Sequence, residues 1–129
     1  MLLETPSLLI TDDDPAFRET LRVVFEPKGF RTLLAGDGEE ALKIVHHEMV
    51  HVVLLDMHMP KLTGIETLRM LKEFRAMLPC ILLSAQLDDL IVEQAHRAHA
   101  YSVLSKTVAI SQITGAVRQA LERTYAWHG

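Results

Sequence analysis

The sequence predicts an α/β protein, a doubly wound three-layer sandwich in which a parallel sheet lies between two layers of helices. Two observations predict this fold class. Short runs of consecutive apolar residues recur along the chain, and segments with the apolar spacing of amphipathic helices lie between them. A strand that is apolar on successive residues is buried on both faces, as in a parallel sheet that helices cover on both sides. Since crossovers between parallel strands are right-handed, five repeats of strand and helix favour the doubly wound arrangement.

The expected strands are short apolar runs. Three of them, Leu8–Ile10, Val52–Leu55 and Cys80–Leu83, are apolar at every position. The run Val103–Leu104 is weaker, and the segment Arg31–Ala35 is more ambiguous. Together these segments predict a sheet of five strands.

The first expected helix has clear boundary signals. Asp14 is a typical N-cap residue, Pro15 suits the first helical position, and Pro27 and Gly29 end the helix. Gly115 lies inside the last helix and should weaken it by about 1 kcal/mol relative to Ala. Apolar spacing predicts the other four helices around residues 41–45, 65–74, 90–98 and 113–121.

Length, charge and cysteine content limit the classes of function. The 129 residues suit one compact domain, expected over residues 1–129 with a core at about 7–124. A net charge of -4 gives no reason to expect direct binding of nucleic acid or of a membrane surface, either of which needs clustered Lys and Arg. Cys80 is the only cysteine, which excludes an intrachain disulfide and favours a reducing cytoplasm. No apolar stretch approaches the roughly 20 residues that span a bilayer, so we expect a chain that is neither exported nor embedded.

Polar residues follow the apolar strands at the points where these end. Asp12 and Asp13 follow the first strand, Asp56 the third, Ser84 the fourth and Lys106 the fifth. The carboxyl ends of parallel strands form one edge of a sheet, where ligands bind in such folds. Clustered carboxylates repel one another unless a cation neutralises them, and magnesium prefers oxygen ligands. The pattern therefore predicts Asp56 as a nucleophile toward phosphorus, with Asp12 and Asp13 binding magnesium and Lys106 spreading the charge.

Several segments carry a resemblance to the CheY-like receiver domains of two-component response regulators. The resemblance extends from about Leu8 to Leu121. It implies a flavodoxin-like sheet of five parallel strands in the order 2-1-3-4-5, and a single receiver domain over the chain. The segments that carry it are residues 8–15, residues 54–60 with Gly64, residues 82–85, and Lys106.

The resemblance also implies a function. A histidine kinase or a histidine phosphotransfer protein would transfer a phosphoryl group to Asp56, Ser84 would bind a phosphoryl oxygen and Lys106 would pair with the phosphoryl group. The domain would switch a surface that binds a downstream effector, an output domain or a second copy, and it would not be a turnover enzyme. The implied ligands of magnesium are Asp12, Asp13, Asp56 and the backbone carbonyl of His58.

Two positions depart from the family pattern. Val103 stands where an aromatic residue commonly reorients together with the Ser or Thr hydroxyl, while Tyr101 lies two residues earlier. Thr107 follows Lys106 where the family usually has Pro. Without Pro, a cis peptide bond rises in cost from under 1 to about 3 kcal/mol. We therefore expect an altered output signal and a different path for this loop, with the phosphorylation chemistry retained.

Three other functions are alternatives to a phosphorylated receiver domain. A pseudo-receiver would have the fold without phosphorylation, and the changes at Val103 and Thr107 keep this alternative open. A haloacid-dehalogenase-like phosphatase normally has its aspartate nucleophile after the first strand, whereas Asp56 follows the third. A flavodoxin-like flavin carrier needs a phosphate loop rich in hydroxyl groups and Gly, and residues 12–14, all Asp, would repel a flavin phosphate. The sequence leaves open whether an output domain belongs to the protein.

Histidines and aromatic residues near the end of the chain are weaker candidates. His46 and His47 are adjacent and point in different directions on a helix, and neither they nor His51 offer a convincing ligand spacing, so zinc is disfavoured. Tyr125 and Trp127 are expected either to pack on the domain or to belong to a frayed tail, and an interaction surface also stays open.

Overall fold

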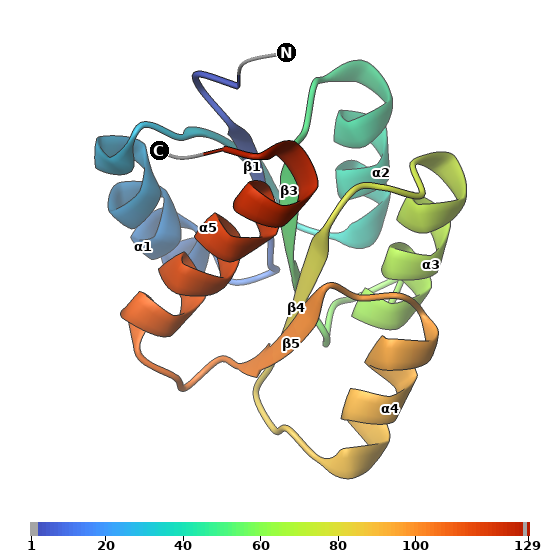
Figure 1. The fold of residues 1–129 in the computed structure, drawn as a ribbon. Helices are drawn as coiled ribbons and strands as arrows, with labels where there is room; N and C mark the ends of the chain where they lie inside the picture. Colours follow the sequence, from blue (N-terminus) through green and yellow to red (C-terminus); the bar gives the residue numbers. More distant parts are fainter. Residues whose placement is uncertain (1–2, 128) are drawn as a thin grey trace.

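The computed structural model describes residues 3–127 and 129 and has the predicted architecture (Figure 1). All neighbouring strands are parallel and their order is β2-β1-β3-β4-β5, so the fold class and the strand order implied by the resemblance are confirmed. The strands are β1 (Ser7–Thr11), β2 (Arg31–Ala35), β3 (Val52–Asp56), β4 (Cys80–Ser84) and β5 (Ser102–Ser105). The helices are α1 (Pro15–Phe25), α2 (Gly38–His47), α3 (Gly64–Phe74), α4 (Asp89–Arg97) and α5 (Ile110–Tyr125), with a short 3-10 helix at Glu26–Lys28.

The sheet separates two hydrophobic cores. Helices α1 and α5 cover one face, and α2, α3 and α4 cover the other (Figure 1). Along β1, Leu9 packs toward α2 and α3, while Leu8 and Ile10 pack toward α1 and α5. β1, β3 and β4 are buried at every position, as expected for central strands covered on both sides. Within the described residues, no helix has the length and apolarity needed to cross a bilayer.

Local signals explain most element boundaries. The Asp14 side chain accepts a hydrogen bond from the amide of Ala16 at 3.0 Å, so the predicted cap of α1 is confirmed. The ambiguous segment Arg31–Ala35 is a strand. One side chain differs from expectation: Phe74 is 47% exposed. It is the last residue of α3, beyond the covered part of the helix, and its ring packs on His46 with centroids 3.7 Å apart.

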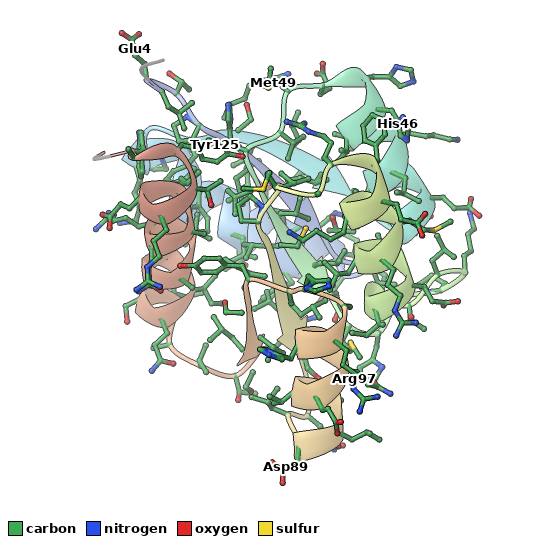
Figure 2. All side chains as sticks on the ribbon, turned by 45° about the vertical axis from the view of Figure 1, so that its right-hand side comes forward. Glu4, His46, Met49, Asp89, Arg97 and Tyr125 are labelled. Carbon is green, nitrogen blue, oxygen red and sulfur yellow. The ribbon has the colours of Figure 1, made fainter. Side chains whose placement is uncertain are left out.

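The aromatic residues at the end of α5 pack on the domain. Trp127 is buried and its ring meets Phe30 edge-on, with centroids 5.5 Å apart. The Tyr125 hydroxyl donates to the backbone carbonyl of His51 at 2.8 Å, at the end of the molecule that also carries Met49 (Figure 2). The packing interpretation is therefore confirmed, and the interpretation as a frayed tail is wrong for these two residues.

His51 connects this end of the molecule to the first strand. Its ring nitrogen Nδ1 accepts a hydrogen bond from the Ser7 amide at 2.9 Å, and the Tyr125 ring lies edge-on at 5.4 Å. An imidazole nitrogen that accepts a hydrogen bond is unprotonated. Burial, followed by the positive charge of Arg75, lowers the pKa of His51 from its ordinary value. His51 is thus a packing residue whose surroundings favour the neutral imidazole.

Two helical glycines should respond oppositely to replacement by Ala. A Cβ at Gly64 would lie 2.5 Å from the carbonyl oxygen of Asp56 and 2.8 Å from the Cα of Met57, whereas a Cβ at Gly115 would meet nothing within 4 Å. We expect Gly64→Ala to lower the free energy of unfolding by about 1–3 kcal/mol and Gly115→Ala to raise it by about 1 kcal/mol. Urea unfolding measures both. An unchanged stability of Gly64→Ala would contradict the close approach of α3 to the strand end.

Acid should weaken the fold through His51. A folded-state pKa below the unfolded value of about 6.5 means that the unfolded chain binds the proton more readily, so this stability is present above that pKa and is lost as the pH falls. In His51→Asn, Oδ1 can accept the Ser7 amide and does not titrate. Between about pH 7.5 and about pH 5.5, we expect the urea midpoint of the wild type to fall further than that of His51→Asn. Equal decreases would show that His51 does not sense this pH range.

Candidate functional site

The carboxyl ends of two adjacent strands bring three acidic residues together. Thr11 of β1 pairs with Leu55 of β3, so the residues that follow them, Asp12 and Asp56, meet at one edge of the sheet. Together with Asp13, their carboxylate oxygens all lie within 4.8 Å of one another. Asp12 and Asp56 are buried, and Asp13 is exposed. Three clustered carboxylates supply only hard oxygen ligands and leave open positions for water, which fits magnesium.

Asp12 is held by the backbone on both sides. Its amide donates to the carbonyl of Ala35 at 3.0 Å, and its Oδ1 accepts from the amide of Asp14 at 2.9 Å. The Arg18 guanidinium donates to the Asp12 carbonyl at 2.6 Å. Asp12 Oδ2 lies 2.7 Å from the Lys106 ammonium and otherwise has no hydrogen-bond partner in the described structure. One Asp12 oxygen therefore faces the shared site.

Lys106 reaches the acids from the fifth strand. Its backbone amide donates to the carbonyl of Ser84 at 2.8 Å, which fixes the start of the loop against β4. Nζ lies 2.7 Å from Asp12 Oδ2 and 3.7 Å from Asp56 Oδ2. Burial lowers the pKa of Lys106, but the hydrogen bond and charge of Asp12 and the charge of Asp56 outweigh burial and raise it. The ammonium form is therefore the one that faces both carboxylates.

The loop after β5 is closed by hydroxyl groups. Every peptide bond among the described residues is trans, including the one between Lys106 and Thr107. The side-chain hydroxyls of Ser105 and Thr107 lie 2.7 Å apart, and the Thr107 amide donates to Ser105 Oγ at 3.2 Å. The cis bond that the family pattern would suggest is absent here, in agreement with the expectation from Thr107.

The Asp56 carboxyl is the electrostatically perturbed member of the cluster. Burial, followed by the charge of Asp12, raises the pKa of Asp56 from 3.8 to about 6. The Lys106 charge and the His58 amide, which donates to Asp56 Oδ1 at 3.4 Å, act in the opposite direction. A divalent cation beside these oxygens would favour the ionised carboxylate, which is the nucleophilic form.

Ser84 has a local partner in this structure. Its side chain is buried and its hydroxyl donates to the backbone carbonyl of Gln86 at 2.7 Å. To bind a phosphoryl oxygen as donor, the hydroxyl would have to leave this carbonyl. The roles predicted for Ser84 and for the His58 carbonyl stay predictions.

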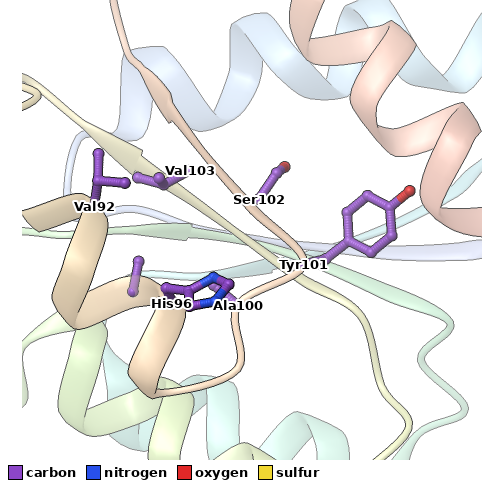
Figure 3. A pocket seen from close by; sticks show the side chains of 7 residues that line it. Val92, His96, Ala100, Tyr101, Ser102 and Val103 are labelled. Carbon is purple, nitrogen blue, oxygen red and sulfur yellow. The ribbon is translucent and has the colours of Figure 1, made fainter.

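Tyr101 and Val103 lie on opposite faces of the sheet. Val103 packs with the core under α2, α3 and α4, and Tyr101 with the core under α1 and α5. Figure 3 shows Val103 beside Val92 of α4 at a pocket of about 90 Å³, while the Tyr101 ring points away toward α5. Tyr101 therefore does not take the place of an aromatic residue at position 103. Its buried hydroxyl and that of Ser102 have no hydrogen-bond partner within residues 3–127 and 129.

Two contributors to the site were missed in the sequence, and both lie on α1. Arg18 donates to the Asp12 carbonyl, and the Phe17 ring centroid lies 4.5 Å from the Lys106 Nζ. Both residues fall on the first turns of α1, immediately after the acidic residues, and this proximity was the available signal. Of the histidines that raised the question of zinc, His46 packs on Phe74 and His51 accepts a hydrogen bond from Ser7.

Sequence comparisons identify relatives along most of the chain. The family model described as the response regulator receiver domain matches residues 8–118. The chain is 32% identical over 116 residues to the DNA-binding response regulator MtrA of Mycolicibacterium smegmatis, covering 90% of this chain and 50% of that protein. It is 35% identical over 119 residues to the response regulator MprA of Mycobacterium leprae, covering 91% and 51%. The chain thus spans about half the length of the curated relatives it matches.

Solved structures have the same fold. The receiver domain of the Francisella response regulator 1452 superposes with a TM-score of 0.87 at 29% identity, covering 92% of this chain and 98% of that one. The response regulator TrrA from Thermotoga maritima, solved in complex with Mg2+-BeF, superposes with a TM-score of 0.82 at 27% identity, covering 90% and 99%. With a family model that matches most of its length, the chain belongs to the response regulator receiver domains of two-component systems.

Proposed function

We propose that this receiver domain accepts a phosphoryl group on Asp56 with Mg2+ bound, and thereby switches a surface that binds a partner. One observation carries the proposal: Asp56 is buried at the end of β3, its carboxylate shares a cluster with Asp12 and Asp13, and the Lys106 ammonium lies 3.7 Å away. A buried carboxylate with this surrounding is suited to attack at phosphorus.

The proposed transfer forms one bond and breaks another. An Asp56 oxygen attacks the phosphorus of the donor, and the new oxygen–phosphorus bond makes an aspartyl phosphate. The leaving atom is a histidine nitrogen of the kinase or phosphotransfer protein. The bond between phosphorus and this nitrogen breaks, and the nitrogen keeps the electron pair. Bound Mg2+ would neutralise charge on the phosphoryl oxygens, with Asp12, Asp13 and Asp56 as its protein ligands. Lys106 would pair with a phosphoryl oxygen, and Ser84 would donate to another after leaving the Gln86 carbonyl.

The proposed partners follow from the family. A histidine kinase or phosphotransfer protein would be the donor, and an effector, an output domain or a second copy would be the receiver of the signal. The relative MtrA is named as DNA-binding, and the chain matches only half of it, so DNA binding by a longer protein is compatible with this role. That the matched stretch itself does not bind nucleic acid stays a prediction from its net charge of -4. A cytoplasmic location and the absence of enzymatic turnover also stay predictions.

A pseudo-receiver is the second candidate function. The Ser84 hydroxyl already has a partner in the Gln86 carbonyl, and Val103 stands in place of an aromatic residue. A domain held in one arrangement by such contacts could bind a partner without phosphorylation. Incubation with acetyl phosphate and Mg2+ separates the two functions, because only a domain that accepts a phosphoryl group gains its mass.

Phosphorylation should occur at Asp56 and require a divalent cation. We expect incubation with acetyl phosphate and Mg2+ to add one phosphoryl group, detected by intact mass and located by peptide mapping. Asp56→Asn should remain unmodified, and chelation of Mg2+ should slow the reaction by at least about tenfold. Asp14→Asn is the matched control, because Asp14 caps α1 and lies outside the acidic cluster. A persistently unmodified wild type would favour the pseudo-receiver.

Removing the Asp56 charge should stabilise the metal-free fold. The raised folded-state pKa means that ionisation of Asp56 destabilises the fold as the pH rises from about 4 through 6. Without Mg2+ at about pH 7.5, we expect Asp56→Asn to unfold with a free energy higher than the wild type by about 1 kcal/mol. The difference should vanish near about pH 3.5 and should shrink or reverse with saturating Mg2+. Urea unfolding at both pH values measures it, and equal stability of both proteins at neutral pH would contradict a raised pKa of Asp56.

A further inference from the structure

An aromatic ring from α1 covers the Lys106 ammonium. The centroid of the Phe17 ring lies 4.5 Å from Lys106 Nζ. We propose that Phe17 is a positioning residue, which holds the Lys106 ammonium beside Asp56 for phosphoryl transfer. The inference rests on the proposed function of Asp56, and it assigns a task to a residue outside the acidic cluster.

The Phe17 ring belongs to a helix whose start is well defined. Phe17 lies in the first turn of α1, whose start is set by the Asp14 cap and by Pro15 at the first helical position. The ring is half-buried and packs against the core under α1 and α5. A side chain locked in this way has few alternative rotamers, so the place of its face is defined before any ligand binds.

The lysine, in contrast, is a flexible side chain that has to be placed. Its four-carbon stem extends from the loop after β5, and its side chain is 21% exposed. Nζ lies closer to Asp12 Oδ2, at 2.7 Å, than to Asp56 Oδ2, at 3.7 Å. The carboxylates attract the ammonium, but they do not cover the side that faces α1. Without the ring, water would reach that side and would weaken the attraction between the carboxylates and the ammonium.

The chemistry of an aromatic ring suits this position better than that of an aliphatic side chain. An ammonium within about 6 Å of a ring centroid is attracted by the negative face of the ring, by about 0.5–1 kcal/mol where the site is partly exposed. A Leu at position 17 would retain most of the apolar packing and would lose this attraction. The ring also excludes water while leaving the ammonium free to approach a phosphoryl oxygen at Asp56.

Three variants separate cation attraction from packing. Phe17→Leu removes the ring, Phe17→Tyr retains it, and Val24→Ala shortens another half-buried side chain of α1 that packs against the same core. The rate of aspartyl phosphate formation is measured by intact mass, with acetyl phosphate and saturating Mg2+. We expect Phe17→Leu to react about two- to fivefold more slowly than the wild type, and Phe17→Tyr and Val24→Ala to react at rates near the wild type.

The side-chain resonances of Lys106 give a readout that needs no phosphorylation. In the wild type and in Phe17→Tyr, the ring current should displace the Lys106 methylene protons next to Nζ upfield, and Phe17→Leu should lose this displacement. Equal rates of Phe17→Leu and wild type would overturn the inference while leaving phosphorylation of Asp56 intact. A rate of Phe17→Tyr as low as that of Phe17→Leu would also overturn it. An unmodified wild type would instead overturn the proposed function, and with it the positioning role.

Discussion

The burial of Asp56 beside a second carboxylate that the backbone brings to it is the constraint on which the site depends. β1 and β3 are adjacent, and their pairing sets Asp12 beside Asp56, so neither acid can move away without breaking the centre of the sheet. Both strands are buried at every position, and the packing of both cores therefore opposes such a movement. Burial, followed by the charge of Asp12, raises the pKa of Asp56 to about 6. The Lys106 ammonium offsets part of the negative charge, and a bound divalent cation would offset the rest.

The loops that follow β3 and β4 beside this cluster differ in how firmly the rest of the fold holds them. On the β3 side, the Gly64 amide donates to the Met57 carbonyl at 2.9 Å, and Met57 donates to Leu83 at 2.8 Å. On the β4 side, Ala95 is the one residue of α4 that is buried among those described. The apolar side chains of Leu87, just before α4, and of Leu90, in its first turn, are exposed. Little burial opposes a displacement of α4, whereas the loop after β3 is tied to β4 and to the start of α3. A change that starts at Asp56 would therefore move the α4 side more easily.

The sequence was sufficient to predict the features that depend on local patterns. Consecutive apolar residues predicted the buried strands, Asp14 and Pro15 predicted the start of α1, and strand ends predicted that Asp12, Asp13 and Asp56 would meet. The contact of Phe17 with Lys106 could not be predicted, because it depends on the distance between α1 and a loop that is remote in sequence. The contact of Arg18 with the Asp12 carbonyl is local in sequence, but it depends on the rotamer of a long side chain. The same holds for the partner of Ser84, which depends on a rotamer, and for the exposure of Phe74, which depends on how far neighbouring elements extend.

The side chain at position 103 limits how a signal could leave the site. Val103 is β-branched, with few accessible rotamers, and it borders a pocket of about 90 Å³, so it offers no large ring whose rotation could be sensed outside. Tyr101 lies against the other core and does not replace it. In the proposed function, the first group to move is then the Ser84 hydroxyl, whose departure would free the Gln86 carbonyl two residues before the Asp88 cap of α4. A signal that uses this route travels through the backbone of the β4–α4 loop, and it needs no aromatic side chain on β5.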